Sequence, residues 1–227
     1  MKKANMSLIN STRSGCRDVF RAFLVKDATY DGDLGIPRIM PESSIPNKLI
    51  LFSKALKSDD HDCWVCFYED DAAFERLWNN PNRYLPILKQ YKGCISPDFS
   101  LYRDMPLVMQ QWNIYRSRAI GHWLQKNGIP VIANVRWSDE RTFDICCDGV
   151  PKGDAIAVGS HGCIKIQRER EFFARGLEHT VKKLKPKTIV VYGAAPESVF
   201  DKYRQAGIEI LQFDSEYMTV HRKAVSE

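Results

Sequence analysis

The residues of this chain that could do chemistry follow its predicted strands, where polar and aromatic side chains replace apolar ones. They are Ser96, Asp98 and Tyr102, then Arg136 and Trp137, then Ser160 and His161, and finally Gly193 and Asp214. Asp98, His161 and Asp214 are candidates for acid–base catalysis, and paired carboxylates also suit a divalent cation. A guanidinium such as that of Arg136 binds phosphate, and an indole such as that of Trp137 stacks on a ring.

Each of these candidates also has a structural interpretation. Asp98 in "SPDFS" suits a turn or a helix cap, and Arg136 suits a surface ion pair, so both interpretations stay open for these two residues. For Asp214 and Trp137 the structural role is favoured. No zinc-finger or "HExxH" spacing occurs, which leaves the identity of any metal open.

A further polar group lies in the segment "NIYRSR". Asn113 and Arg116 are three residues apart and share one face of a predicted helix, which makes this pair a candidate for substrate binding. Arg116 and Arg118 diverge by about 200° around a helix axis. We therefore predict that one of these two arginines is a solvated surface charge.

Residues 160–163, Ser-His-Gly-Cys, resemble the signature of the L,D-transpeptidases, in which a cysteine attacks a peptidoglycan peptide with a nearby histidine as base. That family has a second His-Gly pair shortly before the motif, an all-β fold and a location outside the cytoplasmic membrane, and this chain is expected to have none of these. We favour a tight turn allowed by Gly159 and Gly162. A substrate-binding loop is the next interpretation, and a catalytic Cys163 is the third.

The elements that must position these residues alternate between short apolar runs and helical periods. The predicted strands are 49–52, 63–67, 93–96, 130–135, 155–159, 188–193 and 208–213, and the clearest helices are 105–128, 167–186 and 196–206. In the first helix a stripe of Val108, Trp112, Tyr115, Ala119 and Trp123 is predicted to face the core. The alternation predicts an α/β fold with a mainly parallel sheet, either open and doubly wound or a small or incomplete β/α barrel.

Composition limits the class of protein. The chain has 227 residues, 44% of them hydrophobic and 27% charged, which is enough for one sizeable core. We predict an irregular N-terminal arm over 1–45, rich in Gly, Pro, Ser and Asp, and a single α/β domain over 46–227. The formal net charge of +5 weakly favours an anionic partner such as a nucleotide or nucleic acid.

The cysteines and the apolar runs point to one compartment. Seven scattered cysteines suit reduced, buried thiols, and Cys63-x-x-Cys66 has a redox pair as its alternative interpretation. No signal-peptide core and no apolar run of about 18 residues is seen. We therefore expect a cytoplasmic protein with no membrane partner.

The wording "SPDFS…NIYRSR…VIANVRW…AVGSHGCIK", within roughly residues 90–215, resembles an uncharacterised family of domains of unknown function found in bacteria, phages and mobile elements. The resemblance implies no particular reaction. It leaves two hypotheses of different classes. The first is an enzyme, a hydrolase or lyase acting on a nucleotide, nucleic acid or other phosphorylated substrate. The second is a non-catalytic accessory protein of a phage or mobile element that binds host protein or nucleic acid.

Overall fold

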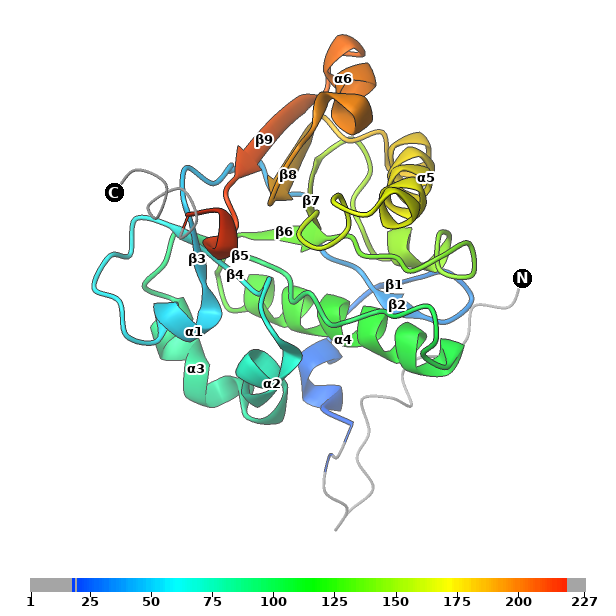
Figure 1. Cartoon of the computed structure of the whole chain (residues 1–227). Coiled ribbons are helices and arrows are strands. Elements are labelled where there is room, and N and C mark those ends of the chain that lie inside the picture. Colours follow the sequence, from blue (N-terminus) through cyan, green and yellow to red (C-terminus); the bar gives the residue numbers. More distant parts are fainter. Residues whose placement is uncertain (1–17, 19, 220–227) are drawn as a thin grey trace.

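The computed structural model describes residue 18 and residues 20–219. Its main element is a seven-stranded sheet in which each strand is parallel to its neighbours (Figure 1). The strands are β3 (Leu49–Leu51), β4 (Trp64–Cys66), β5 (Gly93–Ile95), β6 (Val131–Asn134), β7 (Ala155–Gly159), β8 (Thr188–Tyr192) and β9 (Glu209–Phe213). Each strand lies within a predicted segment. The predicted α/β class with a mainly parallel sheet is therefore confirmed.

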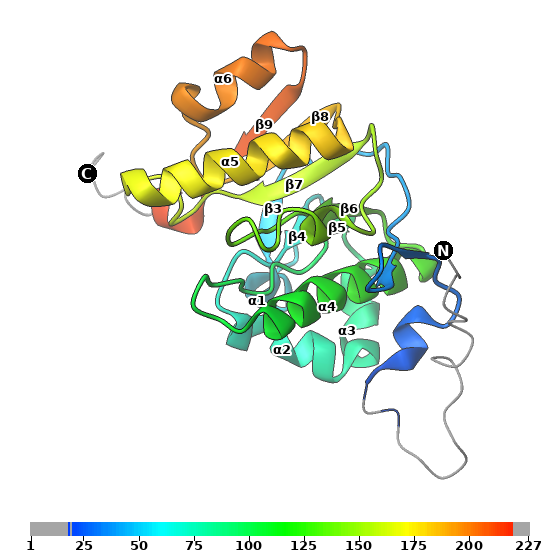
Figure 2. The same ribbon diagram turned by 90° about the vertical axis from the view of Figure 1, so that its right-hand side faces the viewer.

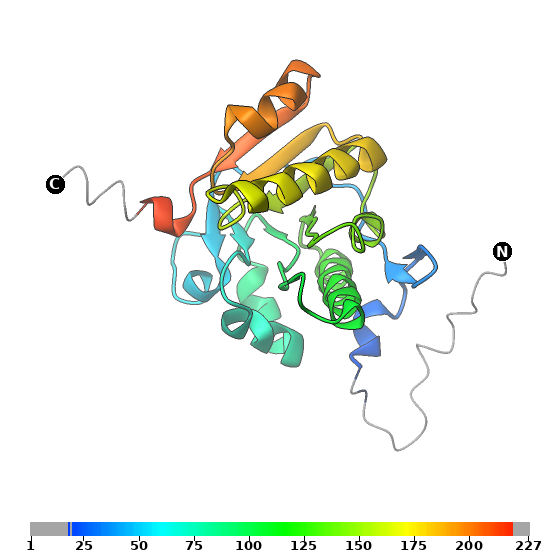
Figure 3. The same cartoon turned by 45° about the vertical axis from the view of Figure 1, so that its right-hand side comes forward.

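Strand order decides between the two predicted architectures. The order across the sheet is the chain order, from β3 to β9. A doubly wound sheet reverses its order at one point, whereas a β/α barrel adds each strand beside the last. This sheet has no reversal and curls into a half-barrel, with the helices around its outer side (Figure 3). The incomplete barrel is the alternative that the structure selects.

The curl is strong enough to bring distant strands together at the carboxyl end of the sheet. Tyr68, just after β4, stacks on Tyr192 of β8 with ring centroids 4.7 Å apart, although three strands lie between β4 and β8. In a flat sheet, four steps of about 4.8 Å would separate these strands by roughly 19 Å. Lys54 and Glu216, which follow the two edge strands, also form an ion pair.

The helices fill the connections between strands. They are α1 (Phe52–Ala55), α2 (Asp71–Asn79), α3 (Pro81–Leu88), α4 (Leu107–Lys126), α5 (Gln167–Leu184) and α6 (Glu197–Gln205). The connection from β6 to β7 instead contains a short 3₁₀ helix, η3 (Ile145–Cys147). Figure 2 shows the two longest helices, α4 and α5, running along the outside of the sheet. Helices α4, α5 and α6 match the three predicted ones to within two residues at each end.

Helix α4 buries a different face from the predicted one. Val108 and Trp112 are 69% and 40% exposed, while Ala119 and Trp123 of the same predicted stripe are buried. The first half of the helix instead buries the polar side chains Gln110, Asn113, Arg116, Ser117 and Arg118. The spacing of apolar residues cannot predict this face, because its buried side chains are polar. Hydrogen bonds compensate for their burial, and the apolar pattern contains no information about those bonds.

The described part of the predicted N-terminal arm contains some regular structure. It forms the 3₁₀ helix η2 (Ala22–Val25) and a small antiparallel pair of strands, β1 (Tyr30–Asp31) and β2 (Ile36–Pro37). Leu24 and Ile39 are buried in the main core. Residues 1–17 and 19 of the predicted arm lie outside the described residues.

Cys63 and Cys66 do not form a facing pair. Cys63 belongs to the core between sheet and helices, while Cys66 belongs to the separate core inside the half-barrel. Residues three apart on a strand point to opposite faces, so the redox pair is excluded in this fold.

Among the described residues, no helix combines the length and the apolar character that crossing a membrane requires.

Candidate functional site

A hydrogen-bonded network of four side chains lies at the carboxyl end of the half-barrel. Asp98 accepts one bond on each carboxylate oxygen, from Asn134 Nδ2 at 2.7 Å and from Arg136 Nη1 at 2.5 Å. Tyr68 donates its hydroxyl to Asn134 Oδ1 at 2.9 Å. The network joins the ends of β4, β5 and β6, and its two central residues, Asp98 and Asn134, are buried.

Burial sets the electrostatics of this network. It raises the pKa of the Asp98 carboxyl, although Arg136 and Asn134 act in the opposite direction. Burial acts to lower the pKa of Arg136, but the Asp98 carboxylate outweighs it and holds that pKa above its ordinary value. Burial also raises the pKa of Tyr68 well above its ordinary value. The network therefore pairs a buried carboxyl of raised pKa with a guanidinium whose pKa is also raised.

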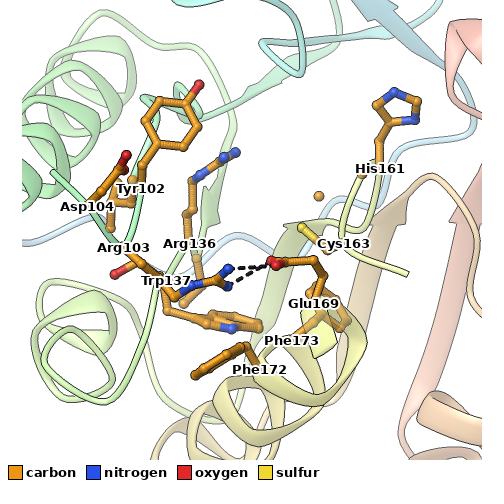
Figure 4. A pocket seen from close by; sticks show the side chains of 15 residues that line it. Tyr102, Arg103, Asp104, Arg136, Trp137, His161, Cys163, Glu169, Phe172 and Phe173 are labelled. Atoms are coloured by element: carbon orange, nitrogen blue, oxygen red, sulfur yellow. Dashed lines mark hydrogen bonds and ion pairs between the residues drawn. The ribbon is translucent and has the colours of Figure 1, made fainter. Parts of the chain in front are cut away.

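A cavity of about 580 Å³ opens on one side of Arg136, and Figure 4 shows its lining. We call it the aromatic cavity, because Trp137, Phe172 and Phe173 form part of its wall. Its charged lining residues are Arg103, Asp104, Arg136 and Glu169. In Figure 4 the Arg136 side chain extends between Tyr102 and His161.

A second cavity, of about 700 Å³, adjoins the first. The two share the lining residues Tyr102, Arg136, Gly159 and His161. We call the second one the acidic cavity, because its other lining residues include Glu69, Asp70, Asp71, Asp98 and Glu216. Asp98, Arg136 and His161 thus line one concave site, as the enzyme hypothesis requires.

Two glycines shape these cavities. A Cβ on Gly159 would lie 2.9 Å from Cδ1 of Tyr68, so the glycine leaves room for the tyrosine ring over the end of β7. A Cβ on Gly176 in α5 would lie 2.1 Å from Nε1 of the buried Trp137. The wall of the aromatic cavity therefore depends on the missing side chain at Gly176.

Gly176→Ala is expected to lower the melting temperature. Alanine inside a helix normally stabilises by about 1 kcal/mol relative to glycine, but here the new methyl group forces Trp137 or α5 to move, at a cost of about 1–3 kcal/mol. Because the second effect is larger, we expect a decrease of a few degrees in differential scanning calorimetry. The control is Glu171→Ala on the exposed face of the same helix. A Gly176→Ala protein more stable than the wild type would contradict this packing.

Three of the site residues predicted from the sequence have structural roles at the strand ends. Ser96 accepts a hydrogen bond on Oγ from Asn134 N at 2.9 Å and contacts Ser117. Ser160 donates its hydroxyl to Ala194 O at 2.7 Å. Gly193 has a φ of 112°, and a Cβ there would lie 2.6 Å from Ser160 Oγ. These contacts hold the strand ends in place, and none of the three residues lines either cavity.

The other predicted residues divide between the cavities and the protein interior. Tyr102 and His161 line both cavities, and Trp137 lines the aromatic one. Asp214 follows β9 and lines neither of the two.

Asn113 and Arg116 lie together, as their spacing predicts, but in the interior between α4 and α2. Arg116 Nη2 donates to Asn113 Oδ1 at 2.6 Å, and its Nη1 pairs with Glu75 at 2.7 Å. The same guanidinium lies 3.9 Å from the ring centroid of Phe99. Substrate binding by this pair stays a prediction that neither cavity supports.

The expectation that Arg116 or Arg118 is a surface charge is wrong, because both are buried. Arg118 is 2% exposed and donates to three backbone carbonyls, those of Asn134, Cys146 and Asp148, at 2.7, 2.7 and 3.1 Å. Burial lowers its pKa to about 10. Both arginines of α4 therefore point into the protein, where they bind groups from other parts of the chain.

Cys163 lines the aromatic cavity. Burial raises the pKa of its thiol, although Arg136 acts to lower it. A nucleophilic cysteine needs a lowered pKa, so this environment is the opposite of the one a catalytic thiol requires. Gly162 has a φ of 79°, which fits the turn favoured for this segment.

Within residue 18 and residues 20–219, no three His, Cys, Asp or Glu side chains are grouped so that they could hold a metal ion. The divalent cation therefore stays a prediction with no ligand set among the described residues.

Sequence reasoning missed four residues of the site. The sequence could have indicated Asn134, because a polar amide within the apolar run "VIANV" needs a buried hydrogen-bond partner. Tyr68 follows β4 as the predicted candidates follow their strands, but an aromatic residue there also suits the core. Arg103 and Glu169 pair across 66 positions of sequence, and no local pattern reveals such a contact.

Comparison with known proteins places the chain in a family. The model of a family described as a domain of unknown function (DUF4417) matches residues 28–214. A protein of Mycobacterium phage L5 named Gene 1 protein is 34% identical over 188 residues, which cover 81% of this chain and 80% of that protein. The Gene 1 protein of Mycobacterium phage D29 is 38% identical over 127 residues, covering 56% of this chain and 47% of that protein.

No solved structure matches the chain. The family match spans the "SPDFS" and "NIYRSR" segments and most of the described residues, and its phage relatives agree with the resemblance seen in the sequence. This chain is therefore a member of the DUF4417 family of domains of unknown function.

Proposed function

We propose that the chain is an enzyme, a hydrolase or lyase, that acts on a nucleotide, nucleic acid or other phosphorylated substrate in the two adjoining cavities. Arg136 binds the anionic group, and Asp98 transfers the proton. His161, which lines both cavities, is a second candidate for proton transfer. Asp214 has no part in this proposal.

The observation that supports it best is the state of Arg136. Among the described residues, its guanidinium has one hydrogen bond, from Nη1 to Asp98, and its side chain is 30% exposed where the cavities meet. The remaining N–H donors are thus available at a site where the cation is already oriented by a buried carboxylate. A guanidinium held in this way is suited to a phosphate or carboxylate.

Asp98 has the environment of a general acid. An acid catalyst at neutral pH needs a carboxyl whose pKa is raised, and burial is the usual means. Burial raises the pKa of Asp98, and the residue lines the acidic cavity beside Arg136. A buried carboxyl that lines a cavity and has one charged partner is a candidate for function.

The first test is a thermal-shift and calorimetric screen against nucleoside 5′-monophosphates, sugar phosphates, short nucleic acids and inorganic phosphate. A ligand that binds the folded state raises the melting temperature by mass action. We expect a shift with at least one phosphorylated probe and its loss in Arg136→Gln. Arg38→Gln, which removes an exposed ion pair with Asp31, is the matched control and should keep the shift.

A second candidate function has its own observation. Val108, Met109 and Trp112 on α4 are 69%, 51% and 40% exposed, and exposed apolar side chains on one helix suit a protein partner. A non-catalytic accessory protein of a phage or mobile element would use such a face. No shift with any phosphorylated probe, together with capture of a host protein that Trp112→Glu abolishes, would favour this function over the enzyme.

A further inference from the structure

An ion pair between residues of two different elements lines the aromatic cavity. Arg103, in the loop between β5 and α4, donates from Nη1 and Nη2 to the two carboxylate oxygens of Glu169 at 2.7 and 2.6 Å. Glu169 lies in the first turn of α5. Figure 4 shows the pair spanning the space between these elements, near Trp137 and Phe173. We call this contact the Arg103–Glu169 bridge.

The bridge rests on aromatic surface. The Arg103 guanidinium lies 4.5 Å from the ring centroid of Phe172, and Trp137 and Phe173 are 5.4 Å apart between ring centroids in a tilted pair. All three rings line the cavity. Aromatic walls with a few charged groups are typical of sites for ring-bearing ligands.

Both arginines of the cavity are engaged by carboxylates of the protein itself. Asp98 holds Arg136 and is buried, so it stays in place when a ligand binds. Glu169 holds Arg103 with both side chains about one third exposed, at 32% and 34%. A phosphate presents the same oxygen geometry to a guanidinium as a carboxylate does. Glu169 is therefore the partner that an incoming phosphate can replace.

We infer that the aromatic cavity is the ring subsite of the proposed site, and that its ligand is a nucleoside phosphate whose phosphate takes the place of Glu169 on Arg103. The inference rests on the proposed function, because Arg136 supplies the other cation of the same site. It narrows the substrate to a compound with an aromatic base, since a sugar phosphate has none to stack on the aromatic wall. It also adds Arg103 as a second binding residue.

The test compares the tightest-binding nucleoside 5′-monophosphate with ribose 5-phosphate and inorganic phosphate by isothermal titration calorimetry. Wild-type protein should bind the nucleotide at least about tenfold more tightly than ribose 5-phosphate, because only the nucleotide has a base that stacks on the aromatic side chains. Arg103→Gln should weaken the nucleotide about tenfold or more. Glu169→Gln should bind it several-fold more tightly, because the competing carboxylate is gone.

The matched control is Glu140→Gln. Glu140 forms an ion pair with Arg175 of the same helix α5, but it does not line the aromatic cavity. This variant should bind the nucleotide as tightly as the wild type does. Tighter binding in Glu169→Gln would then result from the release of Arg103 and not from a general destabilisation of α5.

The outcomes distinguish the two proposals. If the wild type binds no phosphorylated probe, the proposed function fails and the ring subsite fails with it. If Arg136→Gln abolishes binding but Glu169→Gln binds no more tightly than the wild type, the exchange at Arg103 is overturned while the proposed function stands. Equal affinity for the nucleotide and ribose 5-phosphate would overturn the ring subsite alone.

Discussion

Arg118→Met is expected to destabilise the protein by about 3–5 kcal/mol. The guanidinium is 2% exposed and donates to the carbonyls of Asn134, Cys146 and Asp148. Methionine fills a similar volume but donates no hydrogen bond, and a buried acceptor without a partner costs about 1–3 kcal/mol. Relief from burying a charge offsets part of this cost. The loss remains large because the three carbonyls belong to the backbone and cannot be removed with the arginine.

Urea denaturation followed by tryptophan fluorescence measures the effect. At about 2–4 °C per kcal/mol for a chain of this size, the melting temperature should fall by roughly 6–20 °C. Lys126→Met on the exposed end of the same helix is the control and should change stability by less than about 0.5 kcal/mol. An Arg118→Met protein within about 1 kcal/mol of the wild type would show that the three carbonyls find other partners.

Asp98→Asn is expected to reduce turnover by about 10²–10⁴-fold, the usual contribution of general acid–base catalysis. The amide has the same shape as the carboxyl but transfers no proton. Its oxygen can still accept the hydrogen bond from Asn134, while its NH2 group cannot accept the one that Arg136 donates to the carboxylate. Arg136 keeps its charge and its other N–H donors, so the nucleotide affinity should change less than the rate. This division between rate and binding is the signature of a residue that acts on the reaction itself.

The assay monitors release of phosphate and of free base from the nucleoside 5′-monophosphates, which reports cleavage of the phosphate ester and of the glycosidic bond. If Asp98 acts as the acid, the wild-type rate should fall as the pH rises through its pKa, because the proton is then lost, and this fall should be missing in Asp98→Asn. Asp201→Asn, which removes a surface ion pair with Arg204, is the control. Unchanged turnover in Asp98→Asn would rule out the catalytic role.

The elements of this fold are determined by local sequence. The seven strands of the main sheet and the helices α4, α5 and α6 lie where apolar runs and helical periods predict them. Such patterns are local, because side chains return to the same face every second residue in a strand and every three or four residues in a helix. The position of Asp98 and Arg136 after two adjacent strands follows from the same reasoning, since the carboxyl ends of parallel strands meet at one edge.

The tertiary structure decided the rest, because it depends on contacts between residues that are distant in sequence. Strand order selected the half-barrel, and its curl brings Tyr68 onto Tyr192. The sequence predicted that Arg116 or Arg118 is a surface charge, but both are buried, and each binds a partner outside its own helix. The bridge between Arg103 and Glu169 likewise arises only when α5 packs beside the loop after β5. Charged side chains are long and their hydrogen bonds are directional, so their partners are set by the fold and not by their neighbours in the chain.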